Sequence, residues 1–98
     1  MTPPPPNHPL SKFRKRIDRV DDQIVKLLKR RLRYVQQVGE LKAQNGDKVY
    51  DPRREREILA RLCGRNPGAL TSRELRTIYL RILKVSRDHQ KRVFQQSR

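Results

Sequence analysis

The sequence predicts an all-α protein built from three helices that are long, short and long in chain order. Apolar residues recur at steps of three and four, as they do on one face of a helix. Apart from Gly39, all Pro and Gly residues fall in the first nine residues, in the stretch 46–52 or in the stretch 64–68. Three Tyr, two Phe and no Trp also argue against an aromatic-rich β-sandwich or barrel.

The chain begins with a proline-rich segment, MTPPPPNHP, over residues 1–9. This composition predicts an extended, disordered leader. The whole chain has 98 residues, which fits one domain. We therefore expect the domain to occupy residues 10–98.

The first helix is predicted from Leu10 to about Gln44, with Ser11 as its N-cap and the sequence Asn-Gly-Asp as its end. About 34 residues make a helix of roughly 50 Å, whereas a domain of this size has a radius of gyration of about 13 Å. Such a helix extends beyond a monomer and needs a partner. An intertwined antiparallel dimer and a long coiled coil both satisfy this. Its apolar residues are Phe13, Ile17, Val20, Ile24, Leu27, Leu28, Val35, Val38 and Leu41.

Asp51 and Pro52 predict the start of the second helix, as N-cap and first helical residue. The sequence GRNPG at residues 64–68 ends it, and Thr71 or Ser72 then caps the third helix. The second helix carries apolar Ile58, Leu59 and Leu62, and the third carries Leu75, Ile78, Tyr79, Ile82, Leu83, Val85, Val93 and Phe94.

The composition limits the classes of function. The formal net charge is +15, which suits either a binder of nucleic acid or of an anionic surface, or an enzyme for a small anionic substrate. The charge is spread along the chain and is not gathered in one tail. One cysteine, Cys63, allows neither an intramolecular disulfide nor a cysteine-based metal site. No apolar run reaches membrane-spanning length and no hydrophobic signal segment opens the chain, so we expect a cytoplasmic protein.

Two basic residues interrupt the apolar face of the first helix. Arg31 follows Leu28 by three residues, and Lys42 follows Val38 by four. Eleven residues separate them, which leaves them about 20° apart around the helix and about 16 Å apart along it, so both can reach one small anion. Arg14 is about 25 Å from Arg31 and rotated by about 100°. It could serve the ligand of a second copy if two such helices cross.

Three further polar residues fall on apolar faces: Glu55 on the second helix, and Ser86 and Gln90 on the third. Buried polar groups are costly unless they are paired. Each position also has a simpler explanation. Ser86 can bond to its own backbone, Gln90 can face solvent near a frayed end, and Glu55 can pair with Arg54 or Arg31. An arginine such as Arg31 can extend its charge to the surface.

Four segments together resemble the all-helical chorismate mutase family: FRKRIDRVDDQIVKLLKRR, VGELK, VYDPRREREIL and IYLRILKVSRDHQ. The resemblance runs from about Leu10 to Gln90. It implies three-helix subunits intertwined as a homodimer with two equivalent sites. It also implies rearrangement of chorismate to prephenate, in aromatic amino acid biosynthesis, without cofactor or metal.

The resemblance implies a role for each matching residue. Arg14 of the partner subunit and Arg31 of the same subunit would bind the substrate carboxylates. Lys42 would contact a carboxylate and the ether oxygen, and Gln90 would donate to that oxygen.

The remaining implied contacts concern the ring hydroxyl and one carboxylate. Asp51 and Glu55 would bind the hydroxyl, with Arg54 beside them. Ser86 would support a carboxylate. The expected catalytic residues are Arg31, Lys42, Glu55 and Gln90.

Three alternatives remain open. The same scaffold could carry an isochorismate pyruvate-lyase with similar cationic positions. A basic helical nucleic-acid-binding protein would explain runs such as KRRLR but gains nothing from the inward positions of Glu55, Ser86 and Gln90. The domain could also need a partner enzyme of the same pathway for full activity. We expect neither a membrane nor a nucleic acid as partner.

Overall fold

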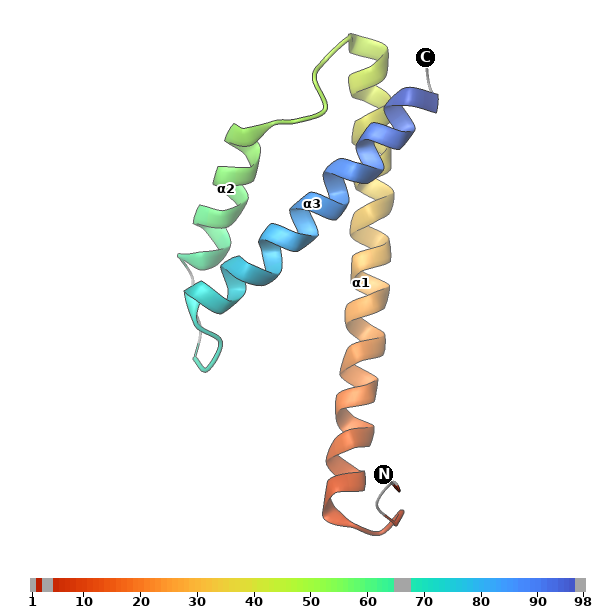
Figure 1. Cartoon of the computed structure of the whole chain (residues 1–98), viewed down its shortest axis with the longest axis vertical. Coiled ribbons are helices and arrows are strands. Elements are labelled where there is room, and N and C mark those ends of the chain that lie inside the picture. The colour runs from red at the N-terminus through yellow and green to blue at the C-terminus, as the bar shows by residue number, and fades with distance from the viewer. Residues whose placement is uncertain (1, 3–4, 65–67, 97–98) are drawn as a thin grey trace. The chain divides into compact units, whose positions relative to one another are not determined.

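The computed structural model describes residues 2, 5–64 and 68–96. Over these residues the chain forms three helices and no strand: α1 (Pro9–Asn45), α2 (Pro52–Cys63) and α3 (Ser72–Gln96) (Figure 1). The predicted all-α fold with a long, a short and a long helix is therefore confirmed. The chain divides into two compact units, Met1–Arg33 and Tyr34–Arg98, which we call the N-terminal and the C-terminal unit.

The start of α1 differs from the prediction in its cap. Ser11 is not the N-cap: it lies inside the helix, and its hydroxyl donates to the Pro5 carbonyl at 2.7 Å. The helix begins earlier because Pro9 has a fixed φ that suits a first helical position and has no N–H to satisfy. The His8 Nδ1 atom accepts a hydrogen bond from the Leu10 N–H at 3.1 Å in the place of the predicted cap. Disorder of residues 1–9 stays a prediction.

The predicted end of α1 is confirmed. Gly46 has a φ of 73°, a left-handed conformation that favours glycine. The Asp47 N–H then donates to the Lys42 carbonyl at 2.9 Å, which satisfies one of the last carbonyls of the helix. This turn starts the loop that leads to α2.

In the C-terminal unit, side chains cap the starts of α2 and α3. The Asp51 carboxylate accepts from the Arg54 N–H at 3.0 Å. Thr71 and Glu74 form a reciprocal capping box, each accepting from the backbone of the other at 3.0 Å. Both predicted caps are thus confirmed, with Thr71 chosen over Ser72. Of the predicted GRNPG ending, residues 65–67 lie outside the described residues.

The core of the C-terminal unit is small and lies between α2 and α3, which run side by side (Figure 1). Ile58 and Leu59 of α2 and Leu83 of α3 are its buried residues, and Leu62 and Tyr79 pack against them. The first turn of α3 is joined to the last turn of α2, because the Ser72 hydroxyl donates to the Cys63 carbonyl at 2.8 Å. These contacts hold α3 against α2 along its first half.

The apolar face of α1 is mostly exposed. We call the following residues the apolar seam; each is between 40% and 58% exposed: Leu10, Phe13, Ile17, Val20, Ile24, Leu27, Leu28, Val38 and Leu41. On α3, Ile78 and Val85 are likewise half exposed, and so lie outside the core that their spacing predicts. A single copy therefore leaves much of its predicted core uncovered.

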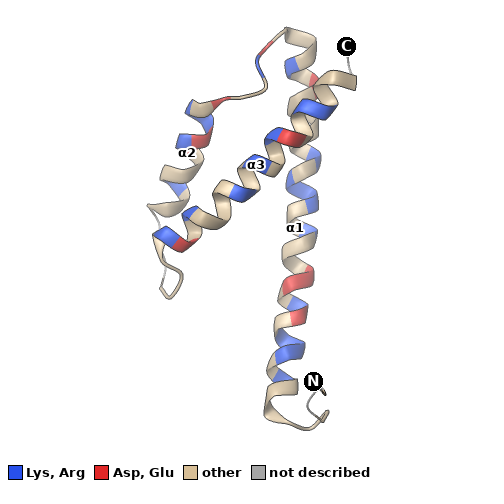
Figure 2. Ribbon diagram, viewed as in Figure 1, with Lys and Arg blue, Asp and Glu red and all other residues tan. Residues whose placement is uncertain are grey.

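Charge is distributed as the sequence predicts. Lys and Arg residues are spread along all three helices, with the acidic residues between them (Figure 2). None of the helices in the described part of the chain is long and apolar enough to cross a membrane.

Candidate active site

A lysine and a glutamine from different helices are hydrogen-bonded to each other in the C-terminal unit. The Lys42 ammonium donates to the Gln90 Oε1 atom at 3.0 Å and to the Val49 carbonyl at 2.8 Å. Both side chains are half-buried. Because an ammonium can only donate, this contact fixes the amide of Gln90 with its oxygen toward Lys42. The Gln90 NH₂ group is then left as a hydrogen-bond donor for a ligand.

Gly39 allows α3 to come this close to α1. It is buried, and a Cβ atom on it would lie 3.3 Å from the Cα of Gln90. Any larger residue at this position would press on the backbone of α3 where it carries Gln90. The sequence showed only an isolated glycine inside a helical pattern, which does not reveal what it contacts.

Glu55 lies at the second polar contact between helices. Its carboxylate accepts from the Arg87 guanidinium at 2.5 Å, and the two side chains are 18% and 29% exposed. The Cζ atom of Arg87 also lies 5.2 Å from the centre of the Tyr50 ring. Helical spacing suggested Arg54 or Arg31 as the partner of Glu55 and did not predict Arg87. The signal that could have indicated Arg87 is its spacing. It follows Leu83 by four residues and precedes Gln90 by three, which places it at the edge of the inward face of α3.

We call the side chains of Lys42, Tyr50, Glu55, Arg87 and Gln90, with the Val49 carbonyl, the polar cluster. It joins residues of α1, the loop before α2, α2 and α3 within one unit. It offers ammonium, guanidinium and amide donors together with a carboxylate acceptor. This combination suits a ligand that carries both anionic groups and a hydroxyl.

Three other predicted residues of the C-terminal unit lie near these elements. Ser86 is buried, and its hydroxyl donates to the Ile82 carbonyl at 2.8 Å. Asp51 uses one carboxylate oxygen for the cap of α2. Arg54 is exposed and lies 3.8 Å from Glu57, with which it forms an ion pair. The inward position of Ser86 is confirmed, and the ligand contacts of all three stay predictions.

The other two predicted residues, Arg14 and Arg31, belong to the N-terminal unit. Arg14 is exposed, and Arg31 is half-buried. Their contribution to a site is taken up below as part of the proposed function.

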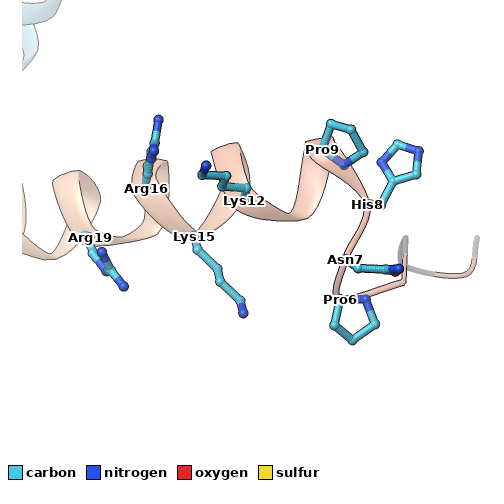
Figure 3. A pocket seen from close by; sticks show the side chains of 8 residues that line it. All are labelled: Pro6, Asn7, His8, Pro9, Lys12, Lys15, Arg16 and Arg19. Carbon is cyan, nitrogen blue, oxygen red and sulfur yellow. The ribbon is translucent and has the colours of Figure 1, made fainter.

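A pocket at the start of α1 is not a convincing site for a small anion. Figure 3 shows that Arg16 extends to one side of the helix, whereas Lys15 and Arg19 extend to the other. Their charges therefore do not converge on one point. Across residues 2, 5–64 and 68–96, no group of three or more His, Cys, Asp or Glu side chains could hold a metal ion.

The comparison with known families settles the family. The sequence matches the family described as "Chorismate mutase type II" over residues 13–91. The chain belongs to this family. The match includes every residue of the polar cluster and all eight residues predicted to bind substrate.

Solved structures of family members are similar over nearly their whole length. The chorismate mutase (form II) of Thermus thermophilus is 39% identical, with a TM-score of 0.84 over 87% of this chain and 97% of that one. The chorismate mutase of Helicobacter pylori in complex with prephenate is 31% identical, with a TM-score of 0.81 over 88% of this chain and 93% of that one.

Two further relatives match over only part of their own length. The bifunctional chorismate mutase/prephenate dehydratase of Aquifex aeolicus is 31% identical over 88 residues, which are 86% of this chain and 24% of that protein. The chorismate mutase of Methanocaldococcus jannaschii is 40% identical over 53 residues, 54% of each chain. The matched segment thus spans about a quarter and about half of the length of these two relatives.

Proposed function

We propose that the protein is a chorismate mutase, which rearranges chorismate to prephenate within one substrate molecule. The observation that carries this proposal is the contact between Lys42 and Gln90, which places a cation and an oriented amide donor side by side in a half-buried position. Membership of the family and the prephenate complex of the Helicobacter pylori relative support it.

The reaction breaks a C–O bond and forms a C–C bond in one concerted step, so it needs no nucleophile, cofactor or metal. The substrate is a flexible dianion that reacts only from a compact, chair-like shape. We propose that Arg31 and the partner subunit's Arg14 bind its two carboxylates through forked hydrogen bonds. Holding both ends makes the reactive conformation the bound one.

As the C–O bond breaks, negative charge grows on the ether oxygen. Lys42 and the NH₂ group of Gln90 are the donors proposed to face that oxygen. Their mutual hydrogen bond and the bond from Lys42 to the Val49 carbonyl fix both groups before substrate binds. Donors that are already oriented stabilise a developing charge without rearrangement, and one such donor is typically worth about 3–4 kcal/mol.

The remaining contacts of the proposed site concern the rest of the substrate. Glu55 and Asp51 would accept from the ring hydroxyl, and Ser86 would support a carboxylate. Arg54 would also contact the substrate. To do so it would break its ion pair with Glu57, which costs little because both side chains are exposed.

We propose that a second copy of the chain covers the apolar seam in an intertwined homodimer. Seam residues such as Ile17 and Ile24 are about half exposed in one copy, and apolar faces of this length are covered in stable proteins.

We expect Ile24→Asp to abolish the dimer, since the new carboxylate would be buried without a partner. Lys26→Asp, an exposed control on the same helix, should leave a dimer. Light scattering after gel filtration measures both, and a dimeric Ile24→Asp variant would contradict the proposal.

Two further expectations belong to the proposed function. We propose that the enzyme acts in the cytoplasm, and that an enzyme of the same pathway can associate with it. The Aquifex aeolicus relative, named as a bifunctional chorismate mutase/prephenate dehydratase, supports association of the mutase with another enzyme.

Product analysis tests the activity and the alternative lyase together. The purified chain is incubated with chorismate and, separately, with isochorismate. Prephenate from chorismate supports the proposal. Salicylate and pyruvate from isochorismate, without prephenate from chorismate, would replace it with the lyase.

A further inference from the structure

Among the polar groups that the proposed reaction does not use, Arg87 makes contacts with two other elements. Its guanidinium donates to the Glu55 carboxylate and lies over the Tyr50 ring. It lies one helical turn before Gln90 on α3. The two residues thus place a polar contact to α2 and a polar contact to α1 on adjacent turns of one helix.

This ion pair is partly buried, with side chains that are 29% and 18% exposed. The core of the unit is made by Ile58, Leu59 and Leu83, and the pair is not part of it. Removing two charges from water costs free energy that their attraction often fails to recover. A pair of this kind at the edge of a proposed anion site therefore calls for a role in the site.

We propose that Arg87 is a positioning residue for Glu55 and for substrate binding. Arg87 occupies the Oε1 atom of the carboxylate, which leaves Oε2 to accept the ring hydroxyl of the substrate. The contact with Tyr50 holds the guanidinium in place. This inference rests on the proposed function, because it assigns Glu55 to the hydroxyl of the substrate.

The ion pair also reduces the repulsion between the Glu55 carboxylate and the substrate. The substrate is a dianion, and a bare Glu55 carboxylate in the same site would repel it. Arg87 cancels that charge while it leaves the carboxylate able to accept a hydrogen bond. Without Arg87, the Glu55 carboxylate would lose its ion-pair partner while it lies beside a doubly negative ligand.

The experiment measures kcat and KM of the intact protein with chorismate for Arg87→Met, Glu55→Gln and the double variant. We expect Arg87→Met to raise KM at least about tenfold and to change kcat less, because ground-state binding is lost. In the Glu55→Gln background the same change should raise KM less than about threefold, because a neutral amide needs no counter-charge. Arg76→Met removes an exposed charge from the same helix and should change neither constant.

A role in folding alone predicts a different result. Equal KM increases from Arg87→Met in both backgrounds, or no increase in either, would overturn the inference. If Arg87→Met does not fold by circular dichroism, Arg87→Lys provides the second measurement. It keeps the charge but not the planar guanidinium. Its KM should therefore rise by less than that of Arg87→Gln, a neutral variant measured beside it; equal increases would contradict the electrostatic role. A wild-type chain that makes no prephenate would instead defeat the proposed function itself.

Discussion

The two units of the chain differ in how far their apolar residues are buried. In the C-terminal unit, α2 and α3 bury Ile58 and Leu83 to 7% and 3% exposure, and polar contacts join residues of all three helices. In the N-terminal unit a single helix carries apolar residues such as Ile17 and Leu27, which stay 57% and 58% exposed. One unit is thus packed by its own chain, and the other presents an uncovered face.

This difference also divides the proposed site. Lys42, Glu55 and Gln90 have partners within the C-terminal unit and are oriented in a single chain. Arg14 and Arg31 lie in the N-terminal unit, where Arg14 is exposed and Arg31 is half-buried. We infer that the chain can orient the donors for the ether oxygen by itself but needs a dimer for the carboxylate contact of Arg14.

The largest effects should come from removing one cation from each unit. We expect Lys42→Ala and Arg31→Ala each to lower kcat/KM at least about a hundredfold, because each would remove a positive donor from the proposed site. Steady-state kinetics with chorismate measures this. Lys48→Ala and Arg33→Ala, at exposed neighbouring positions, are the matched controls. If both site variants lose less than about tenfold, the site has been assigned to the wrong residues.

Mixing two inactive variants tests whether the units of different chains share a site. Arg14→Ala damages the N-terminal unit and Gln90→Ala the C-terminal unit. A heterodimer of the two would have one site with both defects and one site with neither. Random mixing should therefore restore about a quarter of wild-type activity. Gel filtration or mass spectrometry must first show that heterodimers have formed; if they have and remain inactive, Arg14 does not act across the dimer.

A smaller effect is expected where α1 and α3 touch in the C-terminal unit. In Gly39→Ala the new Cβ would lie 3.3 Å from the Cα of Gln90, so the α3 backbone must shift by a few tenths of an ångström. Alanine favours the helix by about 1 kcal/mol, which offsets the crowding in stability. We expect kcat to fall about three- to tenfold while the melting temperature changes little, because donor placement is sensitive to such shifts. A loss of stability with kcat intact would show that Gly39 serves packing only.

The sequence predicted helix boundaries more reliably than it predicted partners. Asp51, Thr71 and the Asn-Gly turn after α1 have local chemistry that acts within a few residues, so their roles could be predicted from spacing alone. Ser11 was misplaced because Pro9 and His8 together offered an earlier start. The partner of Glu55 was missed because Arg87 is 32 residues away, and helical spacing gives the face of a side chain but not the side chain opposite it.

The site was predicted largely through the family resemblance. Spacing alone placed Lys42 and Gln90 on inward faces, but neither their hydrogen bond nor the closeness allowed by Gly39 follows from spacing. Both depend on how α3 packs against α1, which is a property of the tertiary structure.

The smallest predicted effect concerns how the two long helices begin. The α3 helix starts with the Thr71–Glu74 capping box, whereas α1 has no acidic residue in its first turn. Hydrogen bonds from the Thr71 backbone and hydroxyl lower the pKa of Glu74 below its ordinary value of 4.5. A carboxylate whose pKa is lowered by folding stabilises the folded state at pH values above its ordinary pKa. This stabilisation is lost as the pH falls through the lowered pKa. The stability difference between the wild type and Glu74→Gln should therefore be constant near neutral pH and shrink below about pH 4.5. Urea unfolding between pH 7 and pH 3 measures it, with Glu40→Gln as an exposed control on α1. A stability difference that stays constant down to pH 3 would mean that the charge of Glu74 does not contribute to capping. The starts of the two long helices would then not differ in how their stability depends on pH.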